Sequence, residues 1–74
     1  MFAKRLKILR KDLKLTQSEL GKNLNLSQRA ISSYENGLRF PDEQILNSFA
    51  DYFDVSVDYL LGRTNIKNIY KNYD

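Results

Sequence analysis

One short segment near the middle of the chain carries side chains that could read the edges of nucleic-acid bases. Four of them fall on the polar side of an expected helix over residues 28–36: Gln28, Arg29, Ser32 and Ser33. An arginine can donate two hydrogen bonds to O6 and N7 of guanine, and a glutamine can pair with N6 and N7 of adenine. Short serine side chains let a helix backbone approach the bases closely. These residue types favour recognition by hydrogen bonds.

The composition excludes most catalytic and metal chemistry. The 74 residues include no cysteine and no histidine, so Ser–His and Cys–His catalysis is impossible and zinc lacks its two usual ligands. Asp51, Asp54 and Asp58 lack the spacing, the glycine and the glutamate of a calcium loop. We expect these three to be solvated or to cap helices, and we expect no enzyme activity, no metal site and no cofactor.

The charges are divided unevenly along the chain. Residues 1–40 carry nine lysines and arginines against three acidic residues, a balance of +6, and residues 41–74 carry three against six, a balance of −3. The first half can therefore face a polyanion. Taken helix by helix, a solvated basic face explains the same residues equally well.

Length and hydropathy predict a small all-α protein. A chain of 74 residues without disulfides must be stable through packing alone, which favours locally connected helices. No apolar run approaches the roughly 20 residues that span a bilayer, and the start MFAKRLKILRK is too charged for a secretory signal. We expect a cytoplasmic protein that does not contact a membrane.

Two helices precede the polar segment. Apolar residues of the first recur at spacings of four, three and four: Phe2, Leu6, Leu9 and Leu13. The second helix begins at Thr16, because Thr16 and Glu19 have the spacing of a capping box. Leu15 and Leu20 occupy the positions of a hydrophobic staple. Gly21 disfavours a helix by about 1 kcal/mol relative to alanine, so we expect another helix to approach closely there.

A tight turn leads into the helix over residues 28–36. Asn25 tolerates the left-handed conformation that such a turn needs, and Ser27 is a good N-cap. Apolar side chains of both helices can form a wedge that fixes their crossing angle: Leu20, Leu24, Leu26, Ile31 and Tyr34. Two short helices joined in this way form a helix-turn-helix, whose second helix can enter a DNA major groove about 12 Å wide. Backbone N–H groups at both helix starts can point at phosphates.

Two further helices complete the expected fold. Pro41 and Asp42 signal the start of the fourth, which has two rows of apolar residues. Ser56 caps a fifth helix over residues 57–61, and Gly62 ends it.

The motif lies within a longer match to a known family. Arg10, the segment TQSELGKNLNLSQRAISSYENG (16–37), Pro41 and the segment FADYFDVSVDYLLG (49–62) resemble the Xre / lambda-repressor-like (Cro/C1-type) helix-turn-helix family. The resemblance implies a compact five-helix domain in which the second and third helices read DNA. Gly21 replaces the family's usual alanine and Asn25 its usual glycine, and both are compatible with the turn.

The resemblance implies roles for individual residues. The base-reading positions are Gln28, Arg29, Ser32 and Ser33. The positions near the DNA backbone are Arg10, Thr16, Gln17, Ser27, Asn36 and Arg39. Arg10 and Glu35 are implied to form a partly buried ion pair that locks the angle of the third helix; two separate surface charges are the alternative.

Alternatives stay open at the base-reading positions. Arg29 can grip a phosphate instead of a guanine. Gln28 can read adenine, or it can only brace Gln17. Ser32 and Ser33 can simply face solvent.

The implied function is sequence-specific binding of double-stranded DNA. We expect a transcriptional regulator, most simply a repressor that acts as a homodimer on a palindromic operator. The alternative is an antitoxin that binds its toxin and regulates its own operon. A toxin or an antirepressor is therefore the protein partner to consider.

We divide the chain into a DNA-binding domain, residues 1–62, and a C-terminal tail, residues 63–74. One candidate dimer contact is the end of the fifth helix, with Leu60, Leu61 and Arg63. The other is the tail, where helical spacing would gather four apolar side chains: Ile66, Ile69, Tyr70 and Tyr73. The tail can equally be a frayed end or a linker to another domain.

Overall fold

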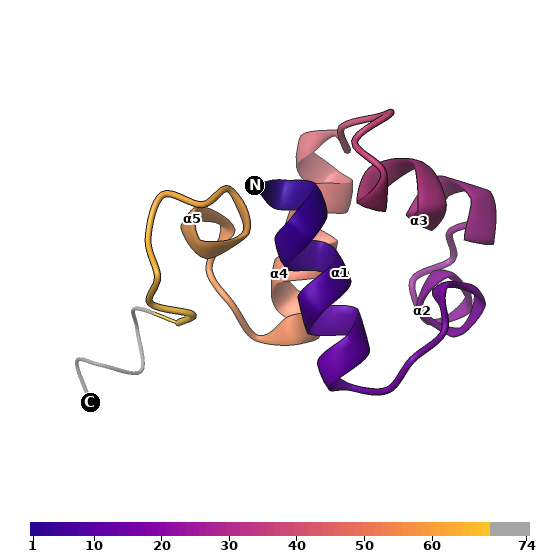
Figure 1. Ribbon diagram of the computed structural model, residues 1–74, viewed down its shortest axis with the longest axis horizontal. Helices are drawn as coiled ribbons and strands as arrows, with labels where there is room; N and C mark the ends of the chain where they lie inside the picture. Colours follow the sequence, from indigo (N-terminus) through magenta and orange to yellow (C-terminus); the bar gives the residue numbers. More distant parts are fainter. Residues whose placement is uncertain (69–74) are drawn as a thin grey trace.

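The computed structural model describes residues 1–68, which form five helices (Figure 1). Their bounds are α1 (Phe2–Asp12), α2 (Gln17–Asn23), α3 (Gln28–Glu35), α4 (Glu43–Phe53) and α5 (Val57–Leu60). Helices α1 and α4 lie in the centre, with α2 and α3 on one side and α5 on the other (Figure 1). The all-α, five-helix prediction is confirmed, and none of the helices in residues 1–68 is long and apolar enough to cross a membrane.

Each helix contributes one fully buried side chain to a single core. These side chains are Leu6, Leu20, Ile31, Phe49 and Leu60. Leu13, predicted to continue the apolar row of α1, is 53% exposed. That prediction was wrong because α1 ends at Asp12 and the chain turns at Lys14, whose φ is 59°.

Side-chain caps begin four of the helices. The capping box of α2 is present: Thr16 Oγ1 accepts from the Glu19 N–H at 3.0 Å, and Glu19 Oε1 accepts from the Thr16 N–H at 2.8 Å. The N-cap side chains of α3, α4 and α5 each accept from the N–H three residues later; they are Ser27, Asp42 and Ser56. These caps fix where α2 and α3 begin.

The backbone of the turn between α2 and α3 packs directly against Gly21. Asn25 has a φ of 58°, as the turn requires. A Cβ atom on Gly21 would lie 2.5 Å from the carbonyl oxygen of Leu26, and the Leu26 N–H donates to the Gly21 carbonyl at 2.7 Å. The neighbour of Gly21 is therefore the backbone of the turn, and the expectation of an approaching helix was wrong.

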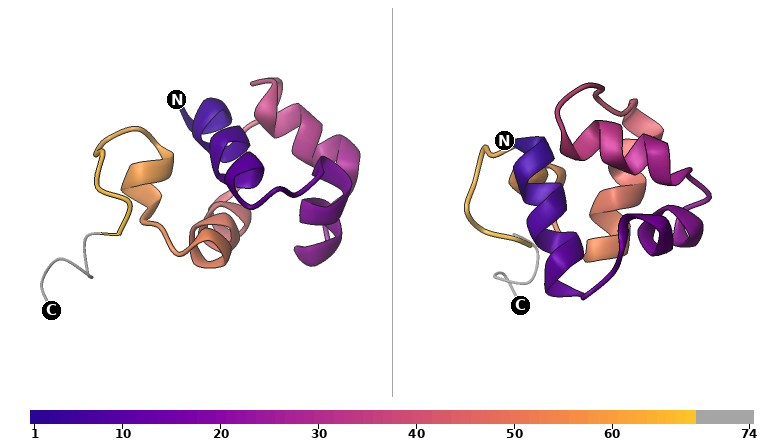
Figure 2. Two further views of the ribbon diagram at one scale, coloured as in Figure 1. Left: turned by 60° about the horizontal axis from the view of Figure 1, so that its bottom comes forward. Right: turned by 45° about the vertical axis from the view of Figure 1, so that its right-hand side comes forward.

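The chain after α5 loops back along the outer side of α5 (Figure 2). Within residues 63–68 there is no helix, and the Ser56 N–H donates to the Lys67 carbonyl at 2.6 Å. Three of the four apolar residues whose spacing suggested a tail helix, Ile69, Tyr70 and Tyr73, lie outside the described residues.

Candidate nucleic-acid interface

A buried ion pair joins α1 to the middle of the motif. Arg10 Nε donates to Glu35 Oε2 at 2.6 Å, and Nη2 donates to Oε1 at 3.0 Å. The two side chains are only 10% and 1% exposed. The hydrogen bond to Glu35, aided by the charge of that carboxylate, raises the pKa of the Arg10 guanidinium despite its burial. A two-pronged contact of this kind fixes angle as well as distance between α1 and α3.

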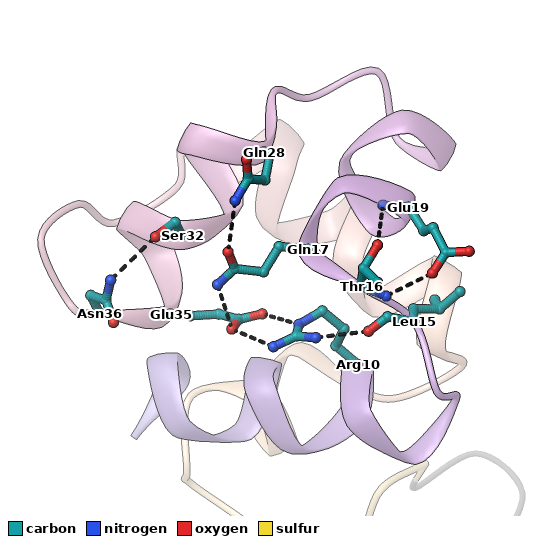
Figure 3. A network of polar contacts seen from close by, with 9 residues as sticks. All are labelled: Arg10, Leu15, Thr16, Gln17, Glu19, Gln28, Ser32, Glu35 and Asn36. Atoms are coloured by element: carbon teal, nitrogen blue, oxygen red, sulfur yellow. Dashed lines mark hydrogen bonds and ion pairs between the residues drawn. The ribbon is translucent and has the colours of Figure 1, made fainter.

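The ion pair continues into a chain of amides that ends at the surface (Figure 3). Gln17 Nε2 donates to Glu35 Oε1 at 3.2 Å, and Gln28 Nε2 donates to Gln17 Oε1 at 3.2 Å. A carboxylate only accepts hydrogen bonds, so Glu35 requires the NH2 end of Gln17 on its side. The oxygen of Gln17 then faces Gln28. The buried charge pair thereby sets the orientation of an exposed side chain on α3.

The Arg10 side chain points into the protein and not toward solvent. Its third nitrogen, Nη1, donates to the Leu15 carbonyl at 2.7 Å. This bond holds the loop that leads into α2, so Arg10 contacts both that loop and α3. The phosphate contact implied for Arg10 remains a prediction, and its hydrogen bonds favour the supporting role.

The outer face of α3 presents the four residues implied to read bases. Gln28 and Arg29 are exposed, whereas Ser32 and Ser33 are half-buried. Asn36 Nδ2 donates to Ser32 Oγ at 3.3 Å. Within residues 1–68, the Arg29 side chain makes no hydrogen bond or ion pair, so its guanidinium is available to a ligand.

The loop after α3 exposes apolar side chains beside a basic one. Leu38 and Phe40 are 76% and 62% exposed. The Arg39 guanidinium lies 5.7 Å from the centroid of the Tyr34 ring. An open groove of about 380 Å³ runs along the loop, and Leu61 also lines it.

Sequence reasoning missed one feature of this surface and one outside it. The exposure of Leu38 and Phe40 was not anticipated, although their place in a loop between two capped helices was a usable signal. The bonds of Arg5 to the end of α5 and the chain after it were also missed. The only local sign was that Arg5 lies beside Leu6 and Leu9 in helical projection.

The chain is similar in sequence to known proteins. Residues 6–60 match a family model described as helix-turn-helix. The HTH-type transcriptional regulator YqaE of Bacillus subtilis is 43% identical over 68 residues, which cover 90% of this chain and 59% of that protein. The antitoxin PezA of Streptococcus pneumoniae is 30% identical over 74 residues, which cover 100% of this chain and 47% of that protein. The chain thus spans about half the length of the curated relatives it matches.

A solved structure has the same fold. The P22 c2 repressor, crystallised with a synthetic operator, superposes with a TM-score of 0.77 and 33% sequence identity. The match covers 81% of this chain and 91% of the repressor chain.

Proposed function

Since the chain belongs to the Cro/C1-type helix-turn-helix family, we propose that it binds double-stranded DNA sequence-specifically and regulates transcription. One observation carries the proposal. Helix α3 is held from behind by the buried pair of Arg10 and Glu35, so the helix that carries the exposed polar side chains has a fixed orientation. Recognition needs such a rigid element, because base contacts are lost when donors and acceptors move out of line.

Arg29 and Gln28 read bases in the first turn of α3. Arg29 donates two guanidinium N–H groups to O6 and N7 of a guanine. Gln28 gives one N–H to Gln17 at 3.2 Å, which leaves its carbonyl oxygen and second N–H for an adenine. Bracing Gln17 and reading a base are therefore compatible roles for Gln28. Ser32 and Ser33 line the same face.

Contacts to the DNA backbone set the register of α3 in the groove. The residues proposed for them are Thr16, Gln17, Ser27, Asn36 and Arg39. The hydroxyl oxygens of Thr16 and Ser27 accept the helix-capping bonds, and the Thr16 N–H donates to Glu19. Each hydroxyl keeps its O–H, which donates to a phosphate in this scheme. Arg10 acts through Glu35 in this scheme.

The protein acts as a homodimer on a palindromic operator and represses by occupying a promoter. One domain reads too few base pairs to find a site in a genome, whereas two domains related by a two-fold axis multiply their affinities. Leu61 lines the groove beside the exposed Leu38 and Phe40, which favours a contact there. Leu60 is buried in the core and is not available to a partner.

Selection of bound fragments from sheared genomic DNA tests the proposal. We expect a two-fold symmetric motif with half-sites about one helical turn apart. Enrichment of all fragments without a shared motif would exclude sequence-specific regulation.

An antitoxin role is the second candidate, and the similarity to PezA over the full 74 residues favours it. In that case the primary partner is a toxin, and DNA binding serves autoregulation. Co-expression with the product of the adjacent gene distinguishes the two roles. A stable complex that abolishes that product's toxicity supports the antitoxin.

A further inference from the structure

Arg5 clamps the segment after α5 to the first helix. Its Nη1 donates to the carbonyls of Tyr59 and Thr64 at 2.7 and 2.6 Å, and Nη2 donates to Asn65 Oδ1 at 2.8 Å. The guanidinium also lies 4.2 Å from the centroid of the Tyr59 ring. One side chain of α1 thus contacts both α5 and the chain that follows it.

The same segment is fastened at its far end. The Lys67 carbonyl accepts from the Ser56 N–H at 2.6 Å, and Asn68 Nδ2 donates to Asp54 Oδ1 at 2.9 Å. Residues 63–68 therefore form a strap that leaves the end of α5 and returns to its beginning (Figure 2). The strap thus ends beside the link between α4 and α5.

Helix α1 carries two arginine clamps five positions apart. Arg10 holds the reading helix α3 through Glu35, and Arg5 holds α5 and the strap. The end of α5, one candidate dimer contact, and the first residues of the tail lie on the part of the chain that Arg5 holds. The reading helix and the candidate dimer contact at the end of α5 are thus both joined to α1.

We propose that Arg5 is a positioning residue that sets which half-site spacing the dimer accepts. This inference rests on the proposed dimeric DNA binding. Each added base pair moves a half-site by about 3.4 Å and turns it by about 34°. If the dimer contact is firmly held, the two domains cannot shift and rotate to reach re-spaced half-sites. If the contact lies on a loosened strap, they can.

The clamp itself is tested without DNA by hydrogen exchange at the Ser56 amide in the full chain. Arg5→Ala should speed exchange of that amide about tenfold through local opening of the strap, while the Ile31 amide in α3 keeps its protection. Lys4→Ala is the matched control, because it removes one positive charge from the exposed neighbouring position. Asn65→Ala removes a single acceptor and should give a smaller effect in the same direction. Unchanged exchange at Ser56 in both clamp variants overturns the inference.

Operators with the selected motif, re-spaced by one and two base pairs in either direction, test the consequence. The wild-type chain and Lys4→Ala should lose at least about tenfold in affinity at altered spacing, and Arg5→Ala should lose less than about threefold. All three should bind a single half-site equally. A spacing profile for Arg5→Ala that matches wild type overturns the role of Arg5 alone. A wild-type chain that selects no DNA motif overturns the proposed function, whatever the exchange experiment shows.

Discussion

The Glu35 carboxylate accepts two hydrogen bonds from Arg10, at 2.6 and 3.0 Å, on a side chain that is 1% exposed. A buried charge without its partner cannot be solvated, so each member of the pair depends on the other. Because one member lies on α1 and the other on α3, the pair couples the stability of the fold to the orientation of the reading helix.

Glu35→Ala should therefore lower the free energy of unfolding by about 3–5 kcal/mol, because it strands the Arg10 guanidinium. Urea denaturation measures the change. Asp58→Ala is a suitable control, since Asp58 and Arg63 form an exposed ion pair at 3.9 Å, worth less than about 1 kcal/mol. Equal effects of the two substitutions would show that the buried pair has no special role.

Arg29→Ala should reduce operator affinity by about 1–3 kcal/mol and relax the preference at one base pair. The reason is the loss of a guanidinium that is exposed on the first turn of α3. Binding to a panel of single-base operator variants measures both effects. If every variant is weakened equally, Arg29 contacts a phosphate and the assignment to guanine is wrong.

Operator affinity should fall steeply with salt, with a log–log slope of about −0.9 for each phosphate neutralised. If each half-site neutralises about four to six phosphates, Arg39→Ala should make the slope shallower by about 0.9 for each half-site. Arg63→Ala removes the same charge from the end of α5 and should leave the slope unchanged if that end contacts only protein. Salt-independent binding would contradict DNA recognition through the basic half of the chain.

Acidification should weaken the start of α2 through Glu19. The hydrogen bond from the Thr16 N–H to its carboxylate lowers the pKa of Glu19, so the folded state binds this proton less readily than the unfolded chain. The stabilisation is therefore complete above the unfolded pKa, near 4.3, and is lost as the pH falls through the lower folded pKa. Glu19→Gln should reduce the melting temperature at pH 7 more than at pH 3. Glu43→Gln, in the exposed first turn of α4, is the control, and the same pH dependence in both variants would exclude the capping box as the cause.

Local signals predicted the elements of this fold well, because the interactions that start and stop helices span only a few residues. Thr16 and Glu19 are three residues apart, and Asn25 needs only its own backbone to adopt a φ of 58°. Gly21 was misread because a helical glycine indicates a close neighbour without saying which one. The neighbour proved to be the backbone of the turn.

The supporting contacts were harder to predict, because they join distant parts of the chain. Arg5 bonds to residues 54 to 60 positions away, and no periodicity brings them together. The amide chain from Glu35 through Gln17 to Gln28 also depends on how α2 and α3 cross. The family resemblance supplied the Arg10–Glu35 contact, whereas the residues alone indicated only two charges.

Two truncations should separate the strap from the rest of the tail. Removal of residues 65–74 deletes the Asn65 side chain that accepts from Arg5 and the Lys67 carbonyl that accepts from Ser56. This truncation should lower the free energy of unfolding by about 1–3 kcal/mol. Removal of residues 69–74 spares these bonds and should cost less. We expect both to lower cooperative binding to a palindromic operator, because both remove apolar residues of the tail that are candidates for the dimer contact. Urea denaturation and operator titration of the same preparations measure the two properties. If the chain ending at Asn68 binds the operator as tightly and as cooperatively as the full chain, the dimer contact lies at the end of α5 and the loop before α4.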